Sequence, residues 1–244
     1  MKKKLLTVLL CVSLVGTLAA GCGGKDKEES SSGDSSDEKK SKVILITMDS
    51  TDQHWVSVDR GAKEEADKLG VDYAWMAPDK KDDAQQIERI NNAVADGADA
   101  IMIAANGPDS ITSALDEAKG EGIKIIYVDS PANTEAEATF ATDNEAAGRT
   151  AGEELIKGLE AAKITEGKIG IIGVNPATQS TVDREKGFRL AFEDSKYELL
   201  ETQFGEGDAA KSQDIADNYI TDGCVGIFGT NEGSTVGAGN AVKG

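Results

Sequence analysis

The chain has 244 residues, with 26 Lys and Arg against 44 Asp and Glu, and its formal net charge at pH 7 is −18. This balance excludes the basic footprint that nucleic-acid-binding proteins need, so we expect no nucleic-acid partner. The sequence has one histidine, His54, and no Cys/His pair at the spacing of metal ligands, which predicts no metal site and no cofactor.

Residues 1–21 have the pattern of a lipoprotein signal peptide. A basic head at residues 2–4 precedes an apolar run at residues 5–20, and small residues lead directly into Cys22. The run is shorter than the roughly 20 residues that span a bilayer, although an ordinary signal peptide or a transmembrane helix stays an alternative. We therefore expect an acylated Cys22 and an extracytoplasmic protein that contacts the cell membrane only through this lipid.

Residues 22–42 are predicted to be the lipidated cysteine and a disordered linker. Gly, Ser, Lys, Glu and Asp dominate this segment, and such a composition cannot bury enough surface to offset the entropy lost on ordering. The remaining residues, 43–244, are long enough to bury a sizeable core. Cys224 is the one cysteine in this remaining part, so we expect no disulfide there and a buried, unreactive thiol.

Short apolar runs alternate with helical patterns from residue 43 onward. The first block predicts strands at residues 43–46, 71–76, 100–104, 123–128 and 138–141. Three amphipathic helices separate the first four of these strands, and the first two helices end at Gly70 and Gly97. Asp83 and Gln86 have the spacing of a capping box, which predicts that the second helix begins there.

The same order begins again after Thr142-Asp143. The second block predicts helices at residues 145–159 and 179–193, one capped by Asp208 and one from Glu232, and strands at residues 168–173, 197–204 and 225–228. Alternating strands and helices of these lengths form βαβ units with parallel sheets. We therefore predict an α/β fold with two doubly wound parallel-sheet lobes, residues 43–142 and 143–244, joined by a hinge.

Polar segments follow the predicted strands, at the sheet edge where such folds bind ligands. They cover residues 49–55, 106–110, 129–130, 175–184 and 231–232. No glycine-rich dinucleotide fingerprint follows a strand, and no phosphate-binding lysine loop is present in the sequence, which disfavours the common modes of nucleotide binding.

Four motifs in order resemble the periplasmic sugar-binding proteins of the ribose-binding type, within the type I periplasmic binding protein family. They are Asp52-Gln53-His54-Trp55-Val56-Ser57, Thr142-Asp143-Asn144, Arg184-Glu185-Lys186-Gly187-Phe188 and Thr230-Asn231-Glu232. The resemblance implies a monomeric receptor that closes on a sugar or sugar-like molecule and delivers it to an ABC permease and its ATPase. Members of this family continue beyond the fourth motif, so we expect the second lobe to be C-terminally incomplete.

By the same resemblance, ligand-binding residues are expected in both lobes. In the first lobe, His54 and Trp55 fall where the family stacks two aromatic rings on the sugar, and Asp52 falls where a side chain binds hydroxyls. Asp129 falls on a carboxylate that binds hydroxyls. Ser130 stands where ribose binders carry an arginine, which argues against ribose itself.

In the second lobe, Arg184 and Asn231 fall on hydroxyl ligands of the family. Their chemistry suits a sugar, because charged groups make the stronger hydrogen bonds to hydroxyls and an aromatic face covers the C–H side of a ring. Other roles stay open: Trp55 as core packing, Arg184 as the partner of a neighbouring acid, Asp183 or Glu185, and Asp129 as a helix or turn cap.

Three classes of function remain open on the sequence. The first is the lipid-anchored sugar receptor of an importer. The second is a sensor of a sugar or an autoinducer-2-type ligand, coupled to a membrane kinase or chemoreceptor. The third, an extracytoplasmic enzyme, is disfavoured because the sequence offers one histidine and no evident nucleophile–base pair.

Overall fold

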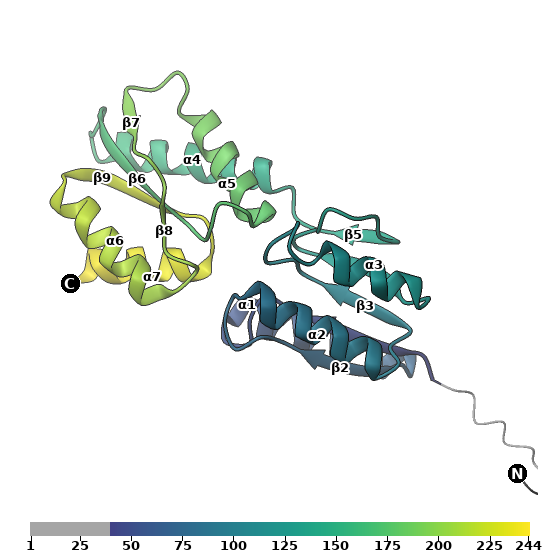
Figure 1. Ribbon diagram of the computed structural model, residues 1–244. Coiled ribbons are helices and arrows are strands. Elements are labelled where there is room, and N and C mark those ends of the chain that lie inside the picture. Colours follow the sequence, from purple (N-terminus) through teal and green to yellow (C-terminus); the bar gives the residue numbers. More distant parts are fainter. Residues whose placement is uncertain (1–39) are drawn as a thin grey trace, which may run out of the picture. The chain divides into compact units, whose positions relative to one another are not determined.

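The computed structural model describes residues 40–244, and Figure 1 shows the order of their helices and strands. The predicted signal peptide, the lipidation site Cys22 and most of the predicted linker lie outside the described residues. In the described part, no helix is long and apolar enough to cross a membrane. The lobe boundary at residues 142–143 stays a prediction.

The first half of the described chain forms one parallel sheet and three helices. In chain order these are β1 (Lys42–Ile46), α1 (Gln53–Leu69), β2 (Asp72–Met76), α2 (Asp83–Ala95), β3 (Ala100–Ile103), α3 (Thr112–Gly120), β4 (Lys124–Val128) and β5 (Ala138–Phe140). The strand order is β2-β1-β3-β4-β5, and every pairing is parallel. Ile44, Leu45 and Ile46 are fully buried, as a strand covered on both faces requires.

The second half forms a four-stranded parallel sheet between two pairs of helices. Its elements are α4 (Asn144–Ala161), β6 (Gly167–Gly173), α5 (Gln179–Ala191), β7 (Tyr197–Leu199), β8 (Gln203–Phe204), α6 (Ala209–Thr221), β9 (Cys224–Gly229) and α7 (Glu232–Lys243). Strand β6 pairs with the other three. Ile169 and Ile171 pack with residues of α4 and α5, whereas Ile172 packs with residues of α6 and α7. Helices therefore cover both faces, which confirms the predicted doubly wound α/β fold.

Two details of the prediction were wrong. The single strand expected at residues 197–204 is divided into β7 and β8. Leu200 still donates its backbone N–H to the Ile169 carbonyl of β6, and between the two strands the Arg189 guanidinium donates to the Leu200 carbonyl and to Thr202 Oγ1. Cys224 is half-buried rather than buried, and burial raises the pKa of its thiol, in keeping with an unreactive group.

The predicted capping box of Asp83 and Gln86 was also wrong. Helix α2 is capped one residue earlier by Asp82, whose side chain accepts from the backbone N–H of Gln85. Asp83 Oδ1 instead accepts from the side-chain amide of Asn106. Gln86 is fully buried, and its side-chain amide makes hydrogen bonds with backbone groups of Thr47, Ala104 and Asn106.

Candidate functional site: a polar cavity at the ends of the strands

A cavity of about 110 Å³ contains all six of the ligand-binding residues predicted from the sequence. Its walls come from turns that follow β1, β2, β4, β6 and β9, at the carboxyl ends of parallel strands, where ligands bind in such sheets. The lining residues are Met48, Asp52, His54, Trp55, Lys81, Asp129, Val174, Thr178, Ser180, Thr181, Arg184, Asn231 and Glu232. Both sheets therefore contribute to one polar site.

Asp129 faces a histidine and an arginine in this cavity. Its Oδ2 lies 3.4 Å from His54 Nε2 and 3.8 Å from Arg184 Nη2, and its Oδ1 accepts from Ser130 Oγ. Burial alone raises the pKa of this carboxyl, but the hydrogen bonds from His54 and Ser130 and the charge of Arg184 outweigh burial and hold the pKa below its usual range. Asp129 is therefore an ionised acceptor, and it caps none of the described helices.

His54 lies against both Asp129 and Trp55. Its ring meets the Trp55 ring edge-on, with the ring centroids 4.5 Å apart. The hydrogen bond to Asp129 raises the pKa of His54, and this effect outweighs the burial that lowers the pKa. The pairing with Asp129 therefore favours the charged form of His54.

This pairing predicts a pH dependence of stability. Because the folded-state pKa of His54 is above its unfolded value of about 6.5, the stabilisation is fully present below that pH and is lost as pH rises through the raised pKa. The melting-temperature difference between wild type and His54→Gln is expected to be larger at pH 6 than at pH 9. An NMR titration of this single imidazole checks the sign directly: a pKa at or below 6.5 would contradict the pairing.

Arg184 crosses from α5 to three other segments. Its Nε donates to Asn144 Oδ1 at 2.8 Å and its Nη1 donates to the Thr230 carbonyl at 3.0 Å, while Nη2 faces Asp129. The guanidinium thus holds the start of α4 and the end of β9 beside the cavity. The side chain is 25% exposed, so part of it remains accessible to a ligand.

The acidic sequence neighbours of Arg184 bind other groups. Asp183 accepts from the side-chain amide of Gln179, and Glu185 pairs with Arg189 at 2.8 Å. The alternative of a local ion pair for Arg184 was therefore wrong.

Trp55 both belongs to the core and lines the cavity. The residue is 3% exposed and packs with Met48 and Ala104 in a small apolar cluster. Its Nε1 has no hydrogen-bond acceptor among the described residues. Most of the Trp55 ring therefore packs in the core, which was one of the roles that the sequence left open. A ligand can contact only the part of the ring that lines the cavity.

Asp52 and Asn231 each cap a helix at the cavity. Asp52 Oδ1 accepts from the His54 backbone N–H at the start of α1, and its Oδ2 lies 3.5 Å from Lys81 Nζ. Asn231 Oδ1 accepts from the Ser234 backbone N–H at the start of α7. In both residues one polar atom is used in the cap and the other remains available for a ligand.

The sequence did not single out several residues of the site. Lys81 lines the cavity from the loop after β2, and nothing in its acidic, lysine-containing surroundings marks it. Thr178 Oγ1 donates to the Asn106 carbonyl at 3.0 Å, and the hydroxyl oxygens of Ser130 and Ser180 lie 2.7 Å apart, at hydrogen-bond distance. These bonds join the turns after β3 and β4 to the segment at the start of α5. Thr178 and Ser180 lie within the predicted segment 175–184, although their role in joining the two halves required the structure.

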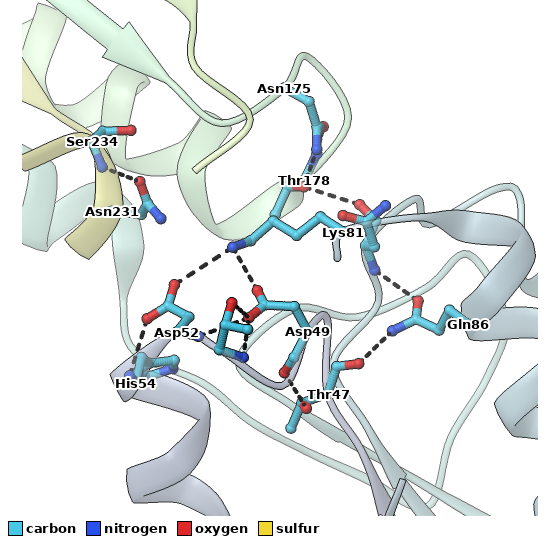
Figure 2. Close-up of polar contacts among 12 residues, drawn as sticks. Thr47, Asp49, Asp52, His54, Lys81, Gln86, Asn175, Thr178, Asn231 and Ser234 are labelled. Atoms are coloured by element: carbon cyan, nitrogen blue, oxygen red, sulfur yellow. Dashed lines mark hydrogen bonds and ion pairs between the residues drawn. The ribbon is translucent and has the colours of Figure 1, made fainter. Parts of the chain in front are cut away.

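The Gln86 side chain holds two turns of the site in place. Its Nε2 donates to the Thr47 carbonyl, as Figure 2 shows, and to the Ala104 carbonyl, and its Oε1 accepts from the Asn106 backbone N–H. One buried amide thus satisfies three backbone groups just after β1 and β3, which would otherwise lie buried without partners.

Replacing Gln86 with methionine is therefore expected to destabilise the protein by about 2–4 kcal/mol, because the volume is kept while buried polar groups lose their partners. Urea denaturation of the variant measures this loss. Gln85→Met is the matched control, because Gln85 is only partly buried and its side chain makes one hydrogen bond, in which Oε1 accepts from the Asp79 backbone N–H. Equal stability of the two variants would contradict the assigned role.

Known proteins match this chain in both sequence and fold. Residues 43–244 match the family described as the periplasmic binding protein domain. The ribose import binding protein RbsB of Escherichia coli is 26% identical, over 99% of this chain and 76% of its own length. Its namesake from Bacillus subtilis is 24% identical, over 99% of this chain and 77% of its own length.

Solved structures show the same fold. An ABC transporter solute binding protein from Agrobacterium vitis, bound with α-D-tagatopyranose, superposes with a TM-score of 0.77 at 26% identity, over 84% of this chain and 72% of its own. A sugar transporter from Clostridium phytofermentans gives 0.76 at 27% identity, over 84% and 76% of the two chains. With a family match across almost all of the described residues, the chain belongs to the periplasmic binding protein domain family.

Proposed function

We propose that this protein is a receptor that captures a sugar or sugar-like polyol in the cavity, without making or breaking covalent bonds. The lining of that cavity carries the proposal. It holds two pairs in which a charged donor lies beside a charged acceptor: Arg184 with Asp129, and Lys81 with Asp52. A hydroxyl both donates and accepts, so such pairs suit a polyhydroxylated ligand. Relatives with sugars in their names or titles support this choice.

Capture would require the two halves, residues 43–142 and 143–244, to separate and close. The cavity of about 110 Å³ is smaller than the roughly 300–1,000 Å³ of common ligand sites. Residues of both sheets line it, so a ligand touches all of them only when the halves are together, and its binding favours that state. Hydrogen bonds such as Thr178 to Asn106 would open as the ligand enters.

The closed receptor would then deliver its ligand to an ABC permease and its ATPase. Support comes from the relatives, among which is an import binding protein, and from the expected lipid at Cys22, which would hold the receptor at the outer side of the cell membrane. Asp52, His54, Trp55, Asp129, Arg184 and Asn231 are the proposed ligand contacts.

A thermal-shift screen of the purified protein against pentoses, hexoses and polyols tests the proposal. A ligand at 100 times its Kd adds about 2.7 kcal/mol, which for a domain of this size raises Tm by roughly 5–10 °C. We expect a shift of that size with one sugar and a smaller shift with its stereoisomers. Flat responses to every sugar, from a protein that unfolds cooperatively, would contradict the proposal.

A further inference from the structure

Lys81 is a buried cation at one end of the cavity. It lies in the loop between β2 and α2, and its side chain is 11% exposed. Its Nζ lies 2.7 Å from Asp49 Oδ2 and 3.5 Å from Asp52 Oδ2, as Figure 2 shows. Burying an ammonium group is costly unless it is paired and hydrogen-bonded. The number of hydrogen-bond partners of Lys81 Nζ therefore shows whether the group still needs an acceptor.

Asp49 is buried and does not line the cavity, so we do not expect it to contact a ligand. Its Oδ1 accepts from the backbone N–H groups of Thr51 and Asp52 and from the Thr51 hydroxyl, and its Oδ2 accepts from Lys81. The Lys81 and backbone bonds together hold its pKa below the usual range, although burial alone raises it. Asp49 therefore shapes the turn after β1 and positions Lys81.

Lys81 retains capacity to donate. An ammonium group has three N–H donors. One binds Asp49 and a second faces Asp52 at a distance too long for a strong bond, which leaves a third with no acceptor in the described part of the chain. Asp52 Oδ2, which has no closer donor among the described residues, can likewise accept. Lys81 and Asp52 thus form a donor–acceptor pair with unused bonds in the lining of the cavity.

Gly207 keeps space open at this end. A Cβ atom on Gly207 would lie 2.9 Å from Lys81 Nζ and 3.1 Å from Asn231 Nδ2. With a φ of 72°, the residue also has the left-handed backbone that favours glycine. The loop before α6 therefore approaches Lys81 without a side chain, which leaves Lys81 Nζ and Asn231 Nδ2 together beside the cavity.

We propose that Lys81 is a specificity-determining residue, which donates a hydrogen bond to one hydroxyl of the sugar while Asp52 accepts from that hydroxyl. This inference rests on the proposed function. The Arg184 and Asp129 pair binds hydroxyls elsewhere in the same cavity, so the ligand is a polyol long enough to be held by two charged pairs. A sugar without the hydroxyl at Lys81 leaves a buried ammonium and a carboxylate unsatisfied, and the site rejects it.

The test compares Lys81→Met with Lys80→Met by calorimetric titration. Lys80 is the matched control, because it is the adjacent lysine, its side chain is 72% exposed, and its nearest acid, Asp82, lies 3.8 Å away. The probes are D-ribose, D-allose and D-tagatose, each with its monodeoxy analogues. Lys81→Met is expected to weaken binding of the preferred sugar by about 10- to 100-fold, the range for a lost charged hydrogen bond, and Lys80→Met is expected to bind as wild type does.

The deoxy analogues distinguish two explanations for a loss of binding in Lys81→Met. Lys81 either contacts the sugar directly or acts only through its ion pair with Asp49. For the one analogue that lacks the hydroxyl at Lys81, wild type and Lys81→Met are expected to bind equally well. An equal loss for every analogue, or no loss for the parent sugar, would overturn the proposal while the proposed function stands. If wild type binds none of the pentoses, hexoses and polyols of the thermal-shift screen, the proposed function fails and this inference fails with it.

Lys81→Gln provides a second variant should Lys81→Met fold poorly. Glutamine keeps an N–H donor without the charge, so we expect an intermediate loss for the parent sugar and the same convergence on the single deoxy analogue. Circular dichroism and Tm measured without ligand establish that each variant is folded. A folded Lys81→Gln protein with unchanged discrimination among the analogues would also overturn the proposal.

Discussion

Replacing Gly148 with alanine is expected to destabilise the protein by at least about 3 kcal/mol, the upper part of the range for overpacking. Gly148 lies in α4, and a Cβ there would lie 1.9 Å from the Arg184 carbonyl oxygen in α5. Gly187 makes the reciprocal approach, since its Cβ would lie 1.9 Å from the Glu145 carbonyl oxygen. Because both obstacles are backbone atoms, the helices must move apart. Urea denaturation measures the loss.

Gly158→Ala is the matched control in the same helix. No atom lies within 4 Å of a Cβ built on Gly158, and alanine is favoured over glycine inside a helix by roughly 1 kcal/mol. We therefore expect Gly158→Ala to be neutral or stabilising. If both variants unfold at the wild-type midpoint, the close approach of α4 and α5 is contradicted. Ligand binding is expected to fall in Gly148→Ala as well, because these helices carry Asn144 and Arg184.

The second large effect is expected for Asp129→Asn, which should weaken sugar binding by about 100-fold or more. His54 and Arg184 both face Oδ2 of Asp129, and an amide oxygen in that place carries no negative charge, so it accepts weaker hydrogen bonds from both. The substitution also leaves the Arg184 guanidinium without its carboxylate partner. The loss corresponds to about 3 kcal/mol, the upper range for a hydrogen bond to a charged group.

Isothermal titration with the best sugar from the thermal-shift screen measures this change. Asp67→Asn on α1 is the control, because Asp67 is exposed and lies outside the lining of the cavity. We expect the control to bind with the wild-type Kd. A folded Asp129→Asn protein that retains the wild-type Kd would remove Asp129 from the ligand contacts.

Much of the fold could be predicted because its signals are local. The apolar run at residues 43–46 and the helical spacing that ends at Gly70 depend only on nearby residues, and the structure places β1 and α1 there. Gly70 itself has a φ of 69°, as a helix-ending glycine requires. The polar segments that contain the site residues followed from the same reasoning, since ligands bind beyond the carboxyl ends of parallel strands, whereas the individual residues were chosen by the family resemblance.

What the sequence missed depends on contacts between distant segments. Gln86 has the spacing of a capping residue, but its amide binds Thr47, Ala104 and Asn106, which are remote in the sequence. The Arg189 contacts between β7 and β8 are missed in the same way, because that side chain comes from the preceding helix.

Lys81 is a similar case. Its role became visible only when its ammonium group was found between Asp49 and Asp52, more than twenty-five positions earlier in the chain. A lysine in an acidic chain is most often a solvated surface group, so local sequence gives no reason to place it in a cavity.

Binding of a sugar in this cavity can be followed by the fluorescence of Trp55. The sequence has two tryptophans, Trp55 and Trp75, so Trp75→Phe leaves Trp55 as the single indole. Trp55 lines the cavity and its Nε1 lacks an acceptor among the described residues, so its emission should respond to an occupant. We expect a saturable change in emission with the preferred sugar, which in Asp129→Asn requires about 100-fold more sugar. A sugar that binds by calorimetry but leaves Trp55 emission unchanged would place the ligand outside this cavity.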